Sequence, residues 1–317
     1  MSSAVTGKAL VGVSACLLGE EVRYNGAHKL DDFICGELAR VVDLRPVCPE
    51  VDIGLGVPRE PIQLTRSDNG TGTRLVAAES GTDLTAAMES YAEAKVRELD
   101  AAGICGYVLK ARSPSCGLGS VPIDGAGAGD GLFAATLRKL GGRLPTTEET
   151  NLEEAADRET FLARVLAYRR LRDLFDGGWK PADLVKHHTR QKLLLMAQSP
   201  DLYSQLGRLV AEAAGAEPAN VENSYRLLTM EAFEQQATAE RHANALEHMR
   251  GYLRKPASEA DYAGLERKIS SFRNGELDLA GVLDDFRRLV KKHSVDYLAL
   301  QVYLEPQPAE LLAGQEN

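Results

Sequence analysis

The sequence predicts an α/β fold in which an N-terminal, Rossmann-like domain with a parallel sheet precedes an all-α helical domain. Apolar runs at residues 10–16, 41–48 and 104–109 are typical of buried strands. Helical patterns separate these runs, which indicates parallel pairing through right-handed crossovers. Beyond about residue 150 almost no strand pattern occurs, so we expect domains at residues 1–149 and 150–317.

Composition narrows the class of protein. A chain of 317 residues with 44% apolar content can bury two cores. The net charge of −9 argues against a chain that is basic throughout, although a local basic surface is compatible with it. The N-terminus lacks the apolar region of a signal peptide, and no run approaches the roughly 18 apolar residues of a membrane span. We therefore expect a cytoplasmic protein without membrane contact, and nothing here indicates its oligomeric state.

The remaining elements of the first domain follow from periodicity and turn residues. Helices are expected at residues 31–40, 83–101 and 132–140, with Gly103 ending the second. A hairpin is expected from residues 62–66 and 73–77, with D-N-G at 68–70 as its turn. The glycine-rich stretch at 125–131 lacks the G-x-G-x-x-G spacing of nucleotide-binding loops, so we interpret it as a flexible connection.

The second domain shows successive helical patterns. One apolar stripe with helical spacing covers residues 161–175. The next helix begins at Pro181, because the first position of a helix does not use the backbone N–H that proline lacks. His188 and His242 align with apolar neighbours and are expected to be satisfied core histidines, whereas His248 can face outward. The further helices are expected at about 201–214, 221–253, 259–273 and 279–304.

Three cysteines stand just past the ends of the three predicted strands: Cys16, Cys48 and Cys116. Ligands of an open parallel sheet sit outside the carboxyl ends of its strands, so we expect these loops to meet. Five cysteines without a secretory signal favour reduced thiols, a metal or catalysis over disulfides. Cys35 and Cys105 lie inside a predicted helix and strand, and we expect both to be ordinary buried thiols.

The spacing of the three cysteines leaves their role open. The intervals 48−16 = 32 and 116−48 = 68 match no zinc-ribbon or ferredoxin run. The thiols could bind zinc with an open fourth position, or hold a cubane iron–sulfur cluster with one iron free. They could also be unrelated buried thiols.

Two further side chains would share a pocket with converging cysteines. Glu50 lies two residues after Cys48, and Ser113 lies three residues before Cys116. A carboxylate and a hydroxyl there could move protons or position water. Alternatively, Glu50 is a solvated loop acid and Ser113 a turn residue ahead of Pro114.

A basic segment opens the second domain. Residues 164–192 hold eight Lys or Arg and three acids, and 8−3 gives a local charge of +5. Basic groups with interleaved aromatics suit RNA, whose phosphates supply affinity and whose exposed bases stack. A solvated helix face is the alternative. The candidate RNA contacts are Trp179, Lys180, Lys186, His187, Arg190 and Lys192.

Five ordered motifs resemble the thiouracil desulfidase family across roughly residues 8–145. They are V-S-A-C-L-L-G (13–19), V-R-Y-N-G (22–26), V-C-P-E (47–50), G-L-G-V-P-R-E-P (54–61) and L-K-A-R-S-P-S-C-G (109–117). The remainder resembles the helical domain fused to one branch of that family, through K-H-H-T-R-Q-K-L-L-L-M-A (186–197), R-H-A-N-A-L-E-H-M-R-G-Y (241–252) and Y-L-A-L-Q-V-Y-L-E-P-Q-P (297–308). This arrangement is similar to that of the tRNA 4-thiouridine desulfidases.

The resemblance implies an enzyme that removes sulfur from 4-thiouridine in tRNA, giving uridine and hydrosulfide without net electron transfer. It implies a 4Fe–4S cluster on Cys16, Cys48 and Cys116, with Glu50 and Ser113 as catalytic residues. The open iron would polarise the C–S bond. The alternatives are a desulfidase of free thiouracil or thionucleosides, and a non-catalytic, zinc-containing RNA-binding protein. We expect substrate contacts from Ser14, Arg23, Arg112 and Ser115.

Overall fold

The structure is a computed structural model that describes residues 7–67, 72–124 and 127–314. It divides into two compact units, Met1–Arg169 and Arg170–Asn317, which we name the sheet unit and the helical unit. The division falls inside α5 (Ala155–Phe175), later than the predicted boundary at 149/150. The reason is that the first half of α5 packs on the sheet. Val165 of α5 lies so close to Gly106 of the sheet that a Cβ added at Gly106 would be only 2.7 Å from a methyl group of Val165.

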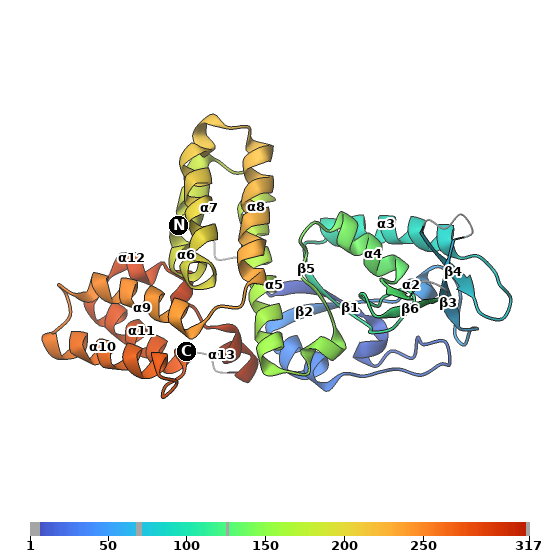
Figure 1. Cartoon of the computed structure of the whole chain (residues 1–317), viewed down its shortest axis with the longest axis horizontal. Coiled ribbons are helices and arrows are strands. Elements are labelled where there is room, and N and C mark those ends of the chain that lie inside the picture. The colour runs from blue at the N-terminus through green and yellow to red at the C-terminus, as the bar shows by residue number, and fades with distance from the viewer. Residues whose placement is uncertain (1–6, 68–71, 125–126, 315–317) are drawn as a thin grey trace. The chain divides into compact units, whose positions relative to one another are not determined.

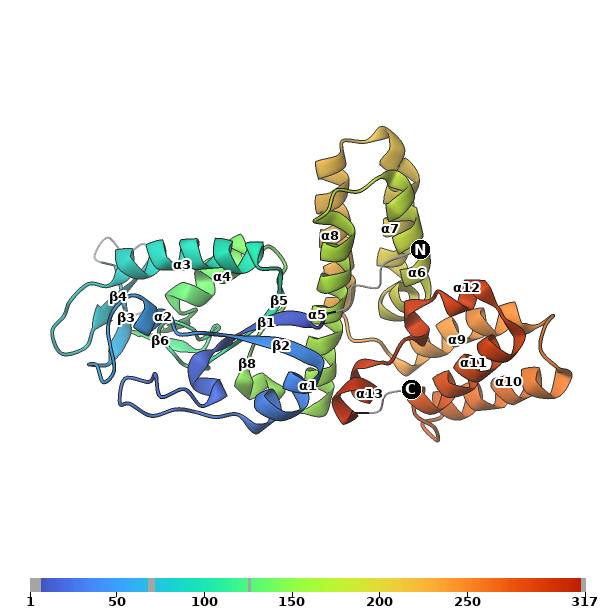
Figure 2. The ribbon, with the colours of Figure 1, turned by 180° about the vertical axis from the view of Figure 1, so that it is seen from behind.

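The sheet unit is built on four parallel strands (Figures 1 and 2). Their order is β2-β1-β5-β8, so β2 and β5 lie on opposite sides of β1. Strands β1, β2 and β5 confirm the prediction, whereas β8 is a short polar strand that the sequence pattern did not indicate. The strands are β1 (Ala9–Ser14), β2 (Val42–Val47), β5 (Ile104–Leu109) and β8 (Thr146–Glu148).

A second sheet has the order β4-β3-β6-β7. Strands β3 and β4 form the predicted antiparallel hairpin, while its expected D-N-G turn lies outside the described residues. The interpretation of 125–131 as a flexible connection was wrong at 127–129, because these residues pair with β6; residues 125–126 lie outside the described ranges. The strands are β3 (Ile62–Arg66), β4 (Thr73–Ala77), β6 (Val121–Asp124) and β7 (Gly127–Gly129).

Helices cover both faces of the parallel sheet, as a buried parallel sheet requires. Helices α3 (Thr85–Ala101) and α4 (Leu132–Leu140) lie side by side, and both were predicted (Figure 1). Phe133 of α4 packs in one core with Tyr107 of β5. Neighbouring residues of a strand point to opposite faces, so Gly106 meets α5 on the other side.

Short turns follow the strands of the parallel sheet. They are the 3₁₀ turn η1 (Ala15–Leu18) after β1, α2 (Pro49–Asp52) after β2 and the 3₁₀ turn η3 (Glu149–Leu152) after β8. The helix expected at residues 31–40 is mostly a π-helix, Ile34–Leu38, followed by α1 (Ala39–Val41). These turns place polar side chains at the carboxyl edge of the sheet.

The helical unit confirms the expected all-α architecture. Its helices are α6 (Pro181–Gln198), α7 (Pro200–Glu212), α8 (Pro218–Glu234), α9 (Ala239–Leu253), α10 (Glu259–Arg273), α11 (Leu279–His293), α12 (Asp296–Ala299) and α13 (Pro308–Ala313). Pro181 lies in the first turn of α6, as predicted. The single helices expected at 221–253 and 279–304 were wrong: each is interrupted, the second at Ser294, whose φ of 52° is left-handed.

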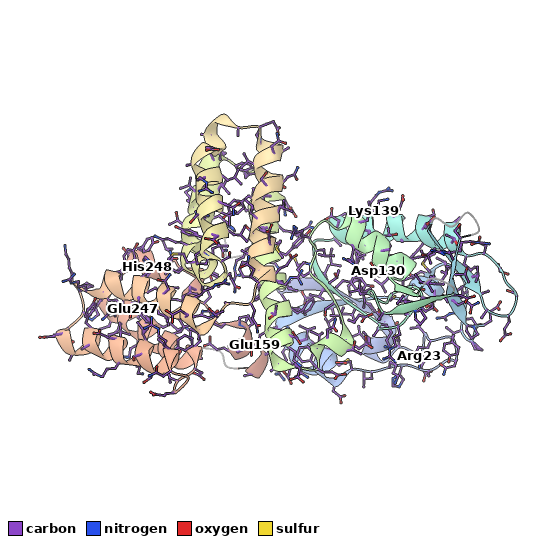
Figure 3. The ribbon with its side chains drawn as sticks, viewed as in Figure 1. Arg23, Asp130, Lys139, Glu159, Glu247 and His248 are labelled. Atoms are coloured by element: carbon purple, nitrogen blue, oxygen red, sulfur yellow. The ribbon has the colours of Figure 1, made fainter. Side chains whose placement is uncertain are left out.

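Three histidines of the helical unit, His188, His242 and His248, lie as predicted. His188 Nδ1 lies 3.1 Å from the hydroxyl of Tyr225, and His242 Nδ1 lies 2.6 Å from that of Tyr303. His248 is exposed on α9 (Figure 3). Within the described ranges, no helix combines the length and apolar character that crossing a membrane requires.

Candidate functional site

The three predicted thiols stand at the carboxyl ends of three adjacent strands. Cys48 directly follows β2, Cys16 lies in η1 after β1, and Cys116 lies in the loop after β5. Cys116 is close enough to the other two for their charges to act on its thiol. Cys16 and Cys116 are buried, with 8% and 4% of their surface exposed, and Cys48 is half-buried. The fold therefore brings the three thiols together at one edge of the sheet.

The environment of the thiols opposes their ionisation. Burial, with a smaller contribution from the charge of Cys48, raises the pKa of Cys16 from 9.0 to about 11. Burial also raises the pKa of Cys48, and raises that of Cys116 well above its usual value. Three such thiols become thiolates together only when a bound cation shares their charge. The set is thus chemically suited to a metal centre.

A metal centre on these three thiols could take two forms. Among the described residues, no group of three or more His, Cys, Asp or Glu side chains is arranged to hold a metal ion. A zinc site would need each thiolate about 2.3 Å from the same atom. In a cubane cluster each cysteine binds a different iron, which spreads the ligands farther apart. All five cysteines are free, which confirms the expectation of reduced thiols.

The other two cysteines do not belong to this group. Cys105 is fully buried within β5, as expected. The expectation that Cys35 is buried was wrong: its side chain is exposed, and its Sγ lies 3.6 Å from the carbonyl oxygen of Leu17. Its place on the π-helix turns it outward.

Glu50 is fixed by an ion pair that the sequence analysis did not identify. Arg59 donates from Nε and Nη2 to Glu50 Oε2, over 3.0 and 2.6 Å. The same guanidinium donates to the carbonyl oxygens of Val22 and Gly56, each over 2.9 Å. Arg59 stands in the motif G-L-G-V-P-R-E-P, so its position was visible in the sequence but its partner was not.

The second oxygen of Glu50 faces two serines. Ser115 Oγ donates to Glu50 Oε1 over 3.0 Å and Ser113 Oγ over 3.4 Å, so the predicted proximity of Glu50 and Ser113 is present. Ser113 Oγ also accepts from the N–H groups of Ser115 and Cys116, at 3.3 and 3.2 Å. Ser115 is fully buried, and its hydroxyl is engaged by Glu50. Ser115 therefore helps to orient Glu50, and its contact with substrate stays a prediction.

The other three predicted substrate contacts lie around the same pocket. Ser14 is buried, accepts from the N–H of Lys110 over 2.9 Å and hydrogen-bonds the Cys116 thiol, so it braces the loop. Arg23 is half-buried, 5.7 Å from the ring centroid of Tyr24, and its charge acts on Cys16 (Figure 3). Arg112 is exposed, with a left-handed φ of 60° that side-chain-bearing residues rarely adopt.

Two acids at the end of β8, Glu148 as its last residue and Glu149 directly after it, hold the cysteine loop; they were missed because β8 was not predicted. Glu149 accepts from the N–H of Ala111 over 2.7 Å and forms an ion pair with Lys110. Glu148 is buried and accepts from the N–H of Leu118 over 2.6 Å. Both ends of the loop that carries Cys116 are therefore anchored to carboxylates.

The candidate RNA contacts in the helical unit differ in availability. Trp179 is half-buried against Phe175, with ring centroids 5.4 Å apart. Arg190 pairs with Glu305 over 3.6 Å. Burial, and next the charge of Arg170, lower the pKa of His187 to about 3, so His187 is neutral and attracts no phosphate. Lys186 pairs with Asp183 over 3.8 Å, although its side chain is exposed. Lys180 is exposed and Lys192 is half-buried.

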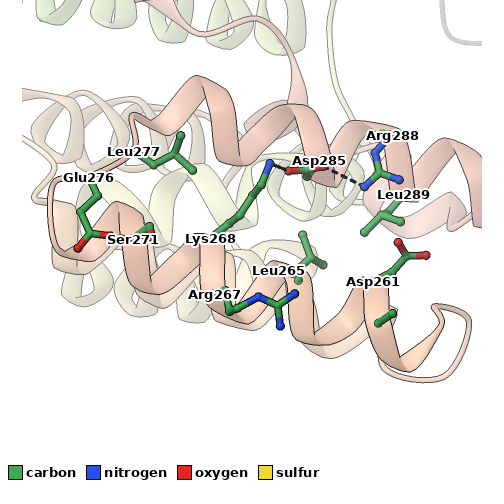
Figure 4. Close-up of a pocket in the computed structure, with 12 residues that line it drawn as sticks. Asp261, Leu265, Arg267, Lys268, Ser271, Glu276, Leu277, Asp285, Arg288 and Leu289 are labelled. Atoms are coloured by element: carbon green, nitrogen blue, oxygen red, sulfur yellow. Dashed lines mark hydrogen bonds and ion pairs between the residues drawn. The ribbon is translucent and has the colours of Figure 1, made fainter.

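A groove of about 430 Å³ lies between α10 and α11 (Figure 4). Lys268 and Arg288 line it, and both contact Asp285. The lining as a whole carries three basic side chains (Arg267, Lys268 and Arg288) and three acidic ones (Asp261, Glu276 and Asp285), so its charges balance. Because the groove also contains none of the predicted site residues, it does not define a site.

The fold and the thiol pocket define an α/β protein suited to metal-dependent chemistry at the carboxyl edge of a parallel sheet. A family model described as 2-thiouracil desulfurase matches residues 11–149, and one described as a protein of unknown function, DUF1722, matches residues 192–308. The uncharacterized protein YbbK of Bacillus subtilis is 34% identical over 156 residues, 45% of this chain and 98% of YbbK. The chain belongs to the 2-thiouracil desulfurase family.

Two further similarities were found. The uncharacterized protein YbgA of Escherichia coli is 28% identical over 153 residues, which are 47% of this chain and 89% of YbgA. A solved structure described as the [4Fe-4S]-dependent thiouracil desulfidase TudS is 36% identical, with a TM-score of 0.40. The comparison covers 50% of this chain and 99% of TudS.

Proposed function

We propose that this protein is an iron–sulfur-dependent desulfidase that converts 4-thiouridine in tRNA to uridine. The observation that carries the proposal is the meeting of three thiols beside Glu50 and Ser113 at one edge of the sheet. Family membership and the description of TudS support the desulfidase activity. The helical unit and its basic segment support a tRNA substrate.

Cys16, Cys48 and Cys116 would hold a 4Fe–4S cluster, because burial raises the pKa of all three thiols, so that they need a bound cation to ionise together, and because TudS is described as [4Fe-4S]-dependent. With three protein ligands, such a cluster leaves one iron open as a Lewis acid for a soft thiocarbonyl sulfur. The burial of Cys16 and Cys116 keeps bulk water from the thiolates. The positive side chains Lys110 and Arg23 favour the charged form of Cys16.

The protein's own groups supply proton transfer. Glu50 Oε2 is committed to Arg59, so Oε1, which faces the two serines, is the atom that can take a proton. Ser113 is only half-buried, and its hydroxyl can relay a proton from an attacking water to Glu50. Water adds its oxygen to the pyrimidine carbon, the C–S bond breaks, and the sulfur departs as hydrosulfide. No net electron transfer is required.

The cluster is tested by anaerobic purification with iron and sulfide analysis. We expect a brown protein, and we expect Cys116→Ala to lose both the cluster and activity. Cys35→Ala is the matched control and should keep both, because Cys35 lies outside the thiol group. A colourless wild-type protein that contains zinc and lacks iron would refute the proposal.

The substrate is tested with the full chain on two compounds, 4-thiouridine-containing tRNA and free thiouracil. The double variant Lys180→Glu and Lys186→Glu should lose turnover of tRNA and keep turnover of the free base, because both side chains are exposed on the helical unit. Turnover of free thiouracil but not of tRNA by the wild-type chain would instead favour a desulfidase of free thiopyrimidines. The printed description of TudS, which names thiouracil, makes this the second candidate.

A further inference from the structure

Tyr107 has an unusual position in the core of the sheet unit. It lies in β5, is fully buried, and packs beside Phe133 with ring centroids 5.7 Å apart. Its ring lies over Gly12 of β1, and a Cβ at Gly12 would be 2.3 Å from the ring carbon Cδ2. The glycine therefore leaves the space that the ring occupies.

The hydroxyl of Tyr107 has no hydrogen-bond partner in the described part of the chain. Tyrosine hydroxyls usually find a partner when they are buried, because an unpaired polar group in the core is costly. The buried Tyr225 and Tyr303 follow this rule, since each contacts a histidine. An unpaired hydroxyl in so well packed a place indicates a partner that is not part of the chain.

The surroundings of the hydroxyl identify that partner. Tyr107 and Cys116 belong to the same core of buried residues, and the charges of Cys116 and, more weakly, of Cys48 act on the phenol. Tyr91 is near the same thiols, but its hydroxyl is already bonded to Asp52. Burial raises the pKa of Tyr107 well above its usual value, so the phenol keeps its proton and can only donate beside a negative group.

We propose that Tyr107 Oη donates a hydrogen bond to a sulfur atom of the iron–sulfur centre held by Cys16, Cys48 and Cys116. This inference rests on the proposed function. Tyr107 is then a positioning residue, because it acts through the centre. A donor to cluster sulfur stabilises the more negative, reduced state and so raises the reduction potential.

The test compares Tyr107→Phe with wild type and with the control Tyr24→Phe, which removes an exposed hydroxyl from the same unit. Reduction potentials are measured anaerobically by redox titration monitored by electron paramagnetic resonance. We expect Tyr107→Phe to retain the cluster at a more negative potential, and Tyr24→Phe to match wild type. An unchanged potential in Tyr107→Phe would overturn this inference alone, whereas wild-type protein without iron would overturn the proposed function as well.

A second measurement uses the cluster-free full-length protein. Phenylalanine fills the same space without the unpaired hydroxyl, so Tyr107→Phe should melt at or above the wild-type temperature. A clearly lower melting temperature would show that the hydroxyl has a partner within the chain, and would overturn the proposal.

Discussion

Replacing Arg59 with methionine removes the cation that holds Glu50. The side chains of Arg59 and Glu50 are only 5% and 16% exposed, and their charged atoms lie 2.6 Å apart. Methionine keeps much of the side-chain volume, so the change isolates the charge and its hydrogen bonds. Glu50 would keep only its two serine donors, and the carbonyl oxygens of Val22 and Gly56 would lose the hydrogen bonds from Arg59, leaving Val22 with the Cys48 thiol as donor.

The expected destabilisation of the sheet unit is about 3–5 kcal/mol, the usual cost of leaving one member of a buried ion pair without its partner. A matched control is Arg97→Met. Arg97 pairs with Glu93 over 3.2 Å, but their side chains are 73% and 54% exposed. Such exposed pairs contribute only about 0–1 kcal/mol, so the control should be nearly neutral.

Hydrogen exchange of the β1 and β5 amides in the cluster-free full chain reports the stability of the sheet unit by itself. The double variant Arg59→Met with Glu50→Gln should be less destabilised than the sum of the single variants, because it no longer buries an uncompensated carboxylate. The reasoning fails if Arg59→Met costs no more than Arg97→Met, or if the two single effects simply add.

Three further predictions concern other parts of the structure. Ser115→Ala should cost about 1 kcal/mol in unfolding free energy and shift the pH profile of activity, because Glu50 loses its donor at 3.0 Å; an unchanged profile would contradict this. Arg112→Gly should raise thermal stability by relieving the φ of 60° while lowering activity, and reduced stability would count against strain at this residue. The pKa of His187 is lowered from 6.5 to about 3 in the folded chain. As the pH falls, the unfolded chain therefore binds a proton at this residue before the folded chain does. The stability of the helical unit should decline from pH 6.5 towards 3 for this reason. Trp179 fluorescence follows this unfolding, and a pH-independent stability, or an equal decline in His187→Gln, would refute it.

Much of the local structure could be predicted from the sequence. The hairpin at Ile62–Arg66 and Thr73–Ala77 and the helix at Leu132–Leu140 have the expected bounds, because apolar periodicity and turn residues are local properties. The ends and interruptions of helices were harder to predict. The helix that ends before Ser294 was expected to continue, because no proline or glycine stands at this position to indicate the break. The strand β8 was missed because three polar residues form a strand only by pairing with β5.

The sequence by itself determined that three thiols, a carboxylate and a serine stand at strand ends, because their spacing along the chain is local information. The tertiary structure decided what each one touches. Glu50 and Ser113 are 63 residues apart in sequence yet hydrogen-bonded, and Ser115 proved to orient Glu50. The ion pair with Arg59 and the unpaired hydroxyl of Tyr107 also emerge only in the fold. Burial and partner choice depend on which distant segments pack together, and no local pattern encodes that.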